Sequence, residues 1–208
     1  MDSSFTLTDI TEFTRHYLAI FYSFVALFYT LRIVFLTRAT AKEVVFPGRP
    51  YCNDWWNHLA FRIFRVTIWW VCLARLFYPQ LDYYLGLFYD FQHPIVIVTG
   101  VALLTSGFLM TILVHFAMGS AWRSGIDPNR PTKLITSGMY QYSRNPMFVF
   151  VAIAQWGFFL ALPSCFSLLC LIIGHLALYR QVREEEKHLS VLFPQEFVAY
   201  TQKVRRWV

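Results

Sequence analysis

Apolar and aromatic residues are grouped into long runs that short polar segments separate. Crossing a bilayer takes about 20 residues, and three runs reach that length, so we predict spans at 17–36, 59–78 and 95–118. A fourth run, 147–179, has no charged residue over 33 positions and is too long for one span. Pro163 and Ser164 interrupt its middle. We therefore predict a helical hairpin with arms at 147–162 and 164–179.

The second predicted span is the least regular, because three arginines interrupt it. Arg62 and Arg65 lie near one end and Arg75 near the other, where long side chains can extend to the membrane surface. We expect a transmembrane helix here, with an amphipathic helix in the interface as the alternative. The hairpin arms, at about 16 residues or roughly 24 Å, are shorter than a hydrocarbon core of roughly 30 Å. They need local thinning of the bilayer or burial against other helices.

The hairpin has a consequence for the polar segments beside it. It returns the chain to the membrane face from which it entered, so segments 134–146 and 183–200 become neighbours there. At the entrance we expect Asn145 to cap the first arm and Pro146 to occupy its first helical position. Beyond the exit, the charged segment that begins at Arg180 is predicted to be helical at least through Leu192.

Composition places the chain in the membrane as one domain. Of its 208 residues 57% are hydrophobic and 14% charged, whereas soluble domains carry about 25% charged residues. We predict an all-α, multi-pass transmembrane helical bundle of about five spans, with a C-terminal hairpin and a cytosolic cofactor site. Residues 1–118 would hold the three N-terminal spans, and 119–208 the cofactor-binding and catalytic region.

The basic residues predict the orientation of this bundle. With five spans, one side of the membrane receives most of them: Arg38, Lys42, Arg49, Arg123, Arg130, Lys133, Arg144 and the C-terminal cluster. The excess of Lys and Arg in cytoplasmic loops then predicts an outer N-terminus and a cytosolic C-terminus. The membrane would be the inner membrane of a bacterial cell or the endoplasmic reticulum of a eukaryotic one. Orientation also explains the net charge of +6, so we expect no nucleic-acid partner.

The four cysteines show neither a C-x-x-C motif nor Cys/His ligand spacing, and three of them lie inside apolar runs. Cysteine in such runs usually behaves as a small hydrophobic residue. We therefore expect no metal site and no disulfide framework.

Two linked motifs flank the hairpin. The first consists of Leu134-Ile135-Thr136-x-Gly138-x-Tyr140 and then Arg144-Asn145-Pro146-Met147-Phe148. The second consists of Glu185-Glu186-x-x-Leu189, Phe193, Glu196-Phe197, Tyr200 and Val204-x-Arg206-Trp207. In this order and spacing the chain resembles the isoprenylcysteine carboxyl methyltransferase and phospholipid methyltransferase family of integral membrane enzymes. It departs from the family pattern, which has His, Tyr, Gly and Pro, at Asn145, Phe148, Pro194 and Arg205. These departures bear on the acceptor more than on the cofactor.

The resemblance implies an S-adenosylmethionine-dependent methyltransferase. Its cofactor needs carboxylates for an amine or a ribose diol, a cation for a carboxylate, and an apolar slot for adenine. Glu185 and Glu186 would serve the first need, Arg144 the second, and Tyr140 with the hairpin's aromatic residues the third. The full predicted set for the cofactor is Leu134, Ile135, Gly138, Tyr140, Arg144, Asn145, Pro146, Glu185 and Glu186. Arg144 and Glu186 are the predicted catalytic residues.

Each of these residues also has a structural interpretation. The glutamates could form a solvated helix face, with Arg180 pairing Glu184 four residues later, and Arg144 could be an orientation charge. Gly138 is either a turn glycine or a point of close approach to the cofactor. As charges at a membrane edge, Arg144 and Glu186 are expected to contribute little to folding.

The methyl acceptor should be lipophilic and reach the site from the bilayer: an isoprenylcysteine-type carboxylate, or a lipid amine or thiol. A carboxylate needs no general base, whereas an amine or thiol must lose a proton, which Glu186 or Glu196 could accept. His115 is a further candidate base, but a lone histidine at a helix end is more often structural, and we leave it outside the predicted site.

Two other functions remain open. Sterol and steroid reductases resemble the C-terminal half of this family and bind NADPH there, but the chain is short for their usual number of spans. A non-catalytic membrane scaffold or transporter would suit the first three spans and leave both polar motifs without a role. No obligate protein partner is evident.

Overall fold

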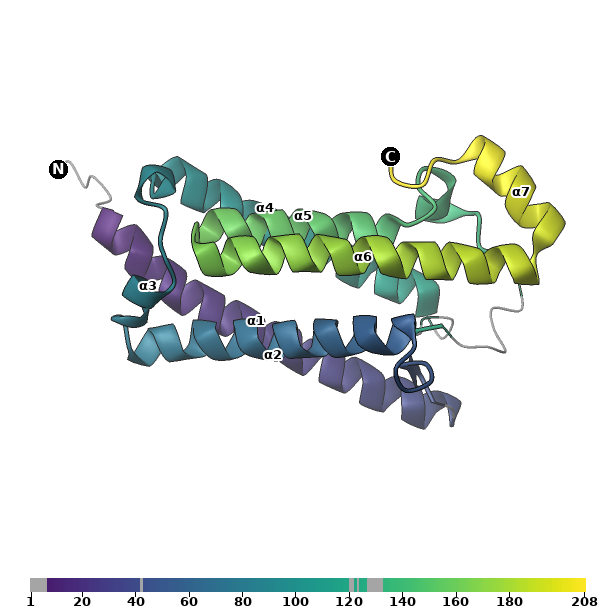
Figure 1. The fold of residues 1–208 in the computed structure, drawn as a ribbon, viewed down its shortest axis with the longest axis horizontal. Coiled ribbons are helices and arrows are strands. Elements are labelled where there is room, and N and C mark those ends of the chain that lie inside the picture. Colours follow the sequence, from purple (N-terminus) through teal and green to yellow (C-terminus); the bar gives the residue numbers. More distant parts are fainter. Residues whose placement is uncertain (1–6, 42, 120–121, 123, 127–132) are drawn as a thin grey trace.

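The computed structural model describes residues 7–41, 43–119, 122, 124–126 and 133–208. These residues form an elongated all-α bundle, as predicted (Figure 1). The helices along its long axis are α1 (Leu7–Thr40), α2 (Asn53–Phe77), α4 (Pro94–Met118), α5 (Pro146–Ala161) and α6 (Cys165–Leu192). Helix α7 (Pro194–Lys203) is at one end, and the short helices are α3 (Leu81–Tyr84), η1 (Tyr89–Phe91) and η3 (Gly138–Gln141).

Among the described residues, three helices are long and apolar enough to cross a membrane: α1, α4 and α6. Helix α4 matches the predicted third span within one residue, but α1, from Leu7 to Thr40, extends beyond the predicted first span at both ends. Helix α2 is continuous for 25 residues, yet its arginines keep it out of this apolar class. Helix α5 has 16 residues. The count of five spans therefore stays a prediction.

The predicted break in the hairpin is confirmed, since α5 ends at Ala161 and α6 begins at Cys165. Ser164 starts α6 with a reciprocal capping box: its Oγ accepts from the backbone N–H of Ser167 at 3.1 Å, and the Ser167 Oγ accepts from the Ser164 N–H at 3.2 Å. Helix α6 joins the predicted second arm to the charged segment from Arg180, and the prediction that this segment is helical through Leu192 is confirmed. Helix α6 carries the charged segment out of the apolar region as one rigid helix.

Glycines bring α4 and α5 into backbone contact. A Cβ atom at Gly107 would lie 2.7 Å from the backbone nitrogen of Ala154, and one at Gly157 would lie 2.2 Å from that of Leu104. Small residues let membrane helices approach this closely without a strong hydrophobic driving force. The contact sets the register of α5 along α4. These glycines played no part in the sequence prediction.

A buried ionic cluster joins α1, α2 and α3 at the end of the bundle opposite α7 (Figure 1). Asp82 pairs with Arg75 through one carboxylate oxygen and with Arg15 through the other, at 2.7 Å. Arg75 is 1% exposed, so the expectation that it reaches the membrane surface is wrong. Burial by itself would raise the pKa of Asp82, but hydrogen bonds and charge from Arg75 and Arg15 outweigh burial and lower it below its usual value.

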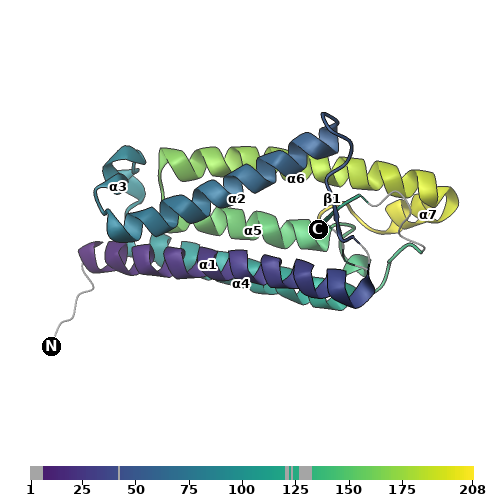
Figure 2. The ribbon, with the colours of Figure 1, turned by 90° about the horizontal axis from the view of Figure 1, so that it is seen from below.

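A two-stranded parallel sheet, absent from the prediction, pairs β1 (Val45–Phe46) with β2 (Ser124–Gly125). Figure 2 shows β1 at the end of the bundle that carries α7. Gly125 has φ +92°, and a Cβ there would lie 2.0 Å from the carbonyl oxygen of Phe46, so this pairing requires glycine. Three residues used for the predicted orientation, Lys42, Arg123 and Arg130, lie outside the described residues.

Candidate functional site

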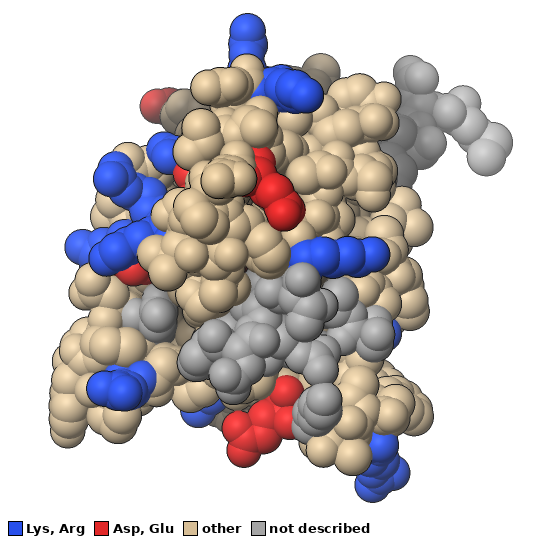
Figure 3. All heavy atoms as spheres, turned by 90° about the vertical axis from the view of Figure 1, so that its right-hand side faces the viewer, with Lys and Arg blue, Asp and Glu red and all other residues tan. Residues whose placement is uncertain are grey.

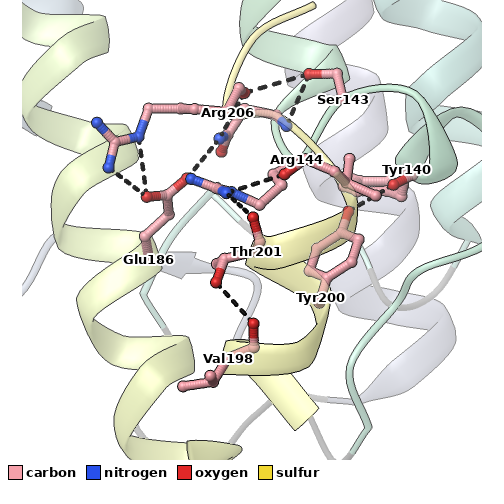
Figure 4. A network of polar contacts seen from close by, with 10 residues as sticks. Tyr140, Ser143, Arg144, Glu186, Val198, Tyr200, Thr201 and Arg206 are labelled. Carbon is pink, nitrogen blue, oxygen red and sulfur yellow. Dashed lines mark hydrogen bonds and ion pairs between the residues drawn. The ribbon is translucent and has the colours of Figure 1, made fainter.

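The two motifs that flank the hairpin meet at Glu186 (Figure 4). One carboxylate oxygen, Oε1, accepts hydrogen bonds from Arg144 Nε and Asn145 Nδ2, each at 3.1 Å. The other, Oε2, accepts from Arg206 Nε at 3.0 Å and Nη2 at 2.8 Å. The hairpin thus brings Arg144 to Glu186, some 40 positions along the chain, and the tail after α7 folds back to bring Arg206 to it from 20 positions away. We refer to Arg144, Asn145, Glu186 and Arg206 as the clamp.

The C-terminal tail wraps around Arg144 and completes this arrangement. Arg144 Nη1 donates to the carbonyl oxygen of Val204 at 3.0 Å, and its backbone N–H donates to that of Arg205 at 3.0 Å. On α7 the Tyr200 hydroxyl donates to the Tyr140 carbonyl at 2.6 Å (Figure 4). The clamp therefore ties the loop before α5, the end of α6 and the tail into one unit.

The centre of the clamp is buried, which corrects the expectation that the charge of Glu186 lies on the surface. Glu186 is 8% exposed, and both of its oxygens belong to ion pairs. Removing one partner of a buried ion pair typically costs about 3–5 kcal/mol, because the remaining charge is left without compensation. Hydrogen bonding to Glu186 raises the pKa of Arg206 above its usual value.

Asn145 occupies the N-cap position of α5 and Pro146 the first helical position, as predicted, but the Asn145 side chain makes no capping bond. Its Nδ2 donates instead to Glu186 and, at 3.2 Å, to the Arg206 carbonyl. The capping role predicted for the Asn145 side chain is therefore wrong. The adjacent Ser143, which the sequence prediction missed, accepts from the Asn145 N–H at 3.1 Å and donates to the Arg206 carbonyl at 3.3 Å.

A cavity of about 260 Å³ lies beside the clamp and is lined by residues of α1, α2, α4, α5 and α6. Most of its lining is aromatic or aliphatic. Its charged and imidazole side chains come from His58, Arg65, His115 and Glu185. A concave, mostly apolar site with a few polar groups is typical of small-molecule sites.

The neighbouring glutamates of the second motif point to different places. Glu185 lines the cavity, where Gln181, one turn earlier, donates to Glu185 Oε1 at 3.0 Å. Glu186 faces the clamp. Successive side chains on an α-helix diverge by roughly 100°, so two adjacent residues reach different surroundings. Within the described part of the chain, Glu185 is the one predicted site residue that lines this cavity.

The remaining predicted residues lie in the loop that the clamp holds. Tyr140 is partly buried, and its hydroxyl donates to Met118 Sδ at 3.4 Å. Burial, followed by the negative charge of Glu185, raises the pKa of Tyr140. Gly138 has φ +64° with open space around it, as expected of a turn glycine. Leu134 and Ile135 are half-buried.

Figure 3 views the end of the bundle that carries α7 and shows Lys and Arg side chains spread around it. Arg38, Lys133 and Lys203 are exposed. Exposed basic residues at this end are consistent with a cytosolic location, and the orientation itself stays a prediction.

Comparison with known proteins identifies the family of the C-terminal half. Residues 95–196 match the family model described as phospholipid methyltransferase. The match begins at the start of α4 and ends in the first turn of α7. It includes the first motif and the Glu185–Glu186 pair, which confirms the family resemblance. No curated protein and no solved structure matches the chain.

Proposed function

The chain belongs to the phospholipid methyltransferase family through residues 95–196, and from that premise we propose that it transfers a methyl group from S-adenosylmethionine to a lipophilic acceptor in the bilayer. Family membership and three long apolar helices establish a membrane protein of a methyltransferase family. The single observation that carries the finer proposal is the cavity beside the clamp, whose apolar wall includes one carboxylate from the family's second motif.

The side chains around Glu185 in the cavity wall fit the chemistry of S-adenosylmethionine. A carboxylate suits the amine, the diol or the positive sulfur, and Glu185 is held in the wall by Gln181, which is 5% exposed. Aromatic faces also attract cations, and Tyr29, Trp122 and Phe148 line the same cavity. We therefore propose Glu185 as the carboxylate that contacts the cofactor.

Arg144 and Glu186, predicted from the sequence to be catalytic, receive a different proposed role. The oxygens of Glu186 already accept four hydrogen bonds from protein groups. We propose that both residues act as positioning residues. They hold the loop that carries Leu134, Ile135 and Tyr140 against α6, and they hold α6 so that Glu185 stays in the cavity wall.

When bound, S-adenosylmethionine supplies an electrophilic methyl group on a positively charged sulfur. The protein's contribution is then mainly to align donor and acceptor. The apolar wall excludes water, which favours a reaction in which charge is lost, and it accommodates a lipophilic acceptor. Glu185 balances the positive charge before transfer.

Thermal melts of the purified protein in detergent test the proposed cofactor. S-adenosylmethionine and S-adenosylhomocysteine should each raise the melting temperature, because a ligand at a hundredfold excess over its Kd stabilises the folded state by about 2.7 kcal/mol. NADPH is the comparison ligand and should have no effect. Stabilisation by NADPH alone would favour the reductase hypothesis, and stabilisation by none of the three would contradict the proposed function.

A further inference from the structure

His115, which the sequence prediction left outside the site, lines the same cavity as Glu185. It is 1% exposed, although it belongs to the last turn of α4. Its Nδ1 atom has no hydrogen-bond partner among the described residues. A buried polar atom left unpaired is rare in folded proteins and calls for an explanation such as a catalytic role or a bound molecule.

The imidazole ring of His115 is held in a fixed orientation. Its centroid lies 4.5 Å from the ring of Trp122, 5.5 Å from Tyr29 and 5.8 Å from Phe28. Arg32 Nη2 donates to the His115 carbonyl at 3.0 Å and secures the backbone at this turn. A ring packed between three aromatic side chains is a preorganised group.

Two close contacts define a common level across α4, α5 and α6. A Cβ at Gly107 would lie 2.7 Å from the backbone of Ala154, so these residues are opposite each other. A Cβ at Gly174 would lie 2.8 Å from the side chain of Gln155, which is the next residue on α5. Gly107 and Gly174 are therefore at about the same depth in the bundle, and both helices run from there toward the clamp.

The helical rise of 1.5 Å per residue then gives the distance of three polar side chains from this level, measured along the helix axes. His115 lies about 12 Å further along α4, Gln181 about 10 Å further along α6, and Glu185 about 16 Å further along α6. His115 is thus between the depths of Gln181 and Glu185, and all three line one cavity. The imidazole and the proposed cofactor carboxylate belong to the same end of it.

We propose that His115 is a catalytic residue for acceptors whose reacting atom carries a proton: the amine, thiol or hydroxyl of a lipophilic molecule. This inference rests on the proposed function. A lone pair on the acceptor atom forms the bond to the methyl carbon, and the old carbon–sulfur bond breaks with its electron pair on the sulfur. The acceptor's proton passes to the unprotonated nitrogen of the His115 ring and later to water.

The hydrogen bonding of the imidazole supports an acceptor of this class. A neutral imidazole has one nitrogen that accepts a hydrogen bond. It can therefore orient a neutral N–H, S–H or O–H group and then take its proton.

The experiment uses two sulfur acceptors with the same chain, dodecane-1-thiol and dodecyl methyl sulfide, with dodecylamine as a second protic probe. The thiol must lose a proton and the sulfide need not. Wild type, His115→Asn and His115→Phe are compared in binding of each probe without cofactor, and in transfer of labelled methyl. His175→Phe is the matched control, because His175 packs on Trp156 and its Nδ1 contacts the Leu171 carbonyl at 3.1 Å.

His115→Asn keeps a hydrogen-bond acceptor but cannot take the proton. It should bind the thiol normally and transfer methyl to it at least about 100-fold more slowly, with transfer to the sulfide unchanged. His115→Phe keeps the ring packing and should also weaken thiol binding about fivefold, the effect of one lost hydrogen bond. His175→Phe should match wild type in every assay.

Equal losses with thiol and sulfide would overturn the proposal and leave His115 a structural residue. A wild-type protein that binds S-adenosylmethionine but methylates neither protic probe would also overturn it. Absence of S-adenosylmethionine binding in wild type would instead contradict the proposed function. Ligand-free melts of each variant show whether a loss of activity comes from misfolding. If His115→Phe does not fold, the comparison of His115→Asn with wild type still tests the proposal.

Discussion

Glu184, Glu185 and Glu186 follow one another on α6. Replacing each by Gln in turn distinguishes a role in folding stability from a role in cofactor binding. Glu186→Gln leaves one oxygen to accept hydrogen bonds and removes the charge opposite Arg144 and Arg206. Loss of one partner of a buried ion pair costs about 3–5 kcal/mol. Arg206 is 36% exposed, and solvent screens its share. The expected loss is therefore near the lower limit, about 3 kcal/mol.

A loss of that size in the free energy of unfolding is measurable as a fall in the melting temperature. For a chain of this length 1 kcal/mol corresponds to about 2–4 °C, so Glu186→Gln should lower the ligand-free melting temperature by roughly 6–12 °C. Glu185→Gln should leave it nearly unchanged, because Gln at position 185 can still accept the hydrogen bond from Gln181. It should instead weaken S-adenosylmethionine binding roughly 10- to 150-fold, the effect of losing a hydrogen bond to a charged group.

The assay is a cofactor titration and a ligand-free melt on the three variants Glu184→Gln, Glu185→Gln and Glu186→Gln. Glu184 precedes the motif, and its variant should behave as wild type in both measurements. The reasoning fails if Glu186→Gln melts like wild type, or if Glu185→Gln binds the cofactor normally. Equal changes in Glu185→Gln and Glu186→Gln would show that the two side chains do not have separate roles.

Three further predictions concern the bundle itself. Gly157→Leu should destabilise the protein by about 3 kcal/mol, the upper end of the usual cost of overpacking, because its Cβ would lie 2.2 Å from the backbone of Leu104. Chemical unfolding measures this, and a stable variant would refute the close packing. Asp82→Asn leaves Arg75 buried without its carboxylate and should cost about 3–5 kcal/mol. Since the folded-state pKa of Asp82 is lowered, the stability that its carboxylate contributes is present above the unfolded pKa and is lost as the pH falls through the folded pKa. The difference in melting temperature between the variant and wild type should therefore shrink as the pH falls below about 4. Cys52, with the other cysteines replaced, should react with an impermeant thiol reagent in opened cells and not in intact ones; labelling in intact cells would reverse the orientation.

The hairpin could be predicted because its determinants are local. Pro163 has no backbone N–H to donate and Ser164 is a strong capping residue, so α5 must end and α6 can begin there wherever the segment lies. The charged continuation of α6 through Leu192 was also predicted. It has no stop signal of its own before Pro194, and the helix passes from the apolar region into the clamp without a break.

Roles that depend on distant partners could not be predicted. Asn145 has the sequence context of a cap, yet its amide donates to Glu186 and to the tail, which approach only in the folded protein. Arg75 lies near the end of an apolar run, and only the position of Asp82 on α3 makes its burial possible. His115 could be placed at a helix end, but its position in the cavity wall depends on how α1 and α6 pack around α4.

Length, apolar composition and turn residues act over short stretches of chain, and they were enough to predict the membrane class, the helical hairpin and the two polar motifs at its ends. Which glutamate belongs to the clamp and which to the cavity depends on the tertiary structure. Glu185 and Glu186 are equivalent in local sequence and differ by one step of helical rotation. Only the packing of the C-terminal tail and α5 against α6 gives one face of the helix two arginines and leaves the other facing the cavity.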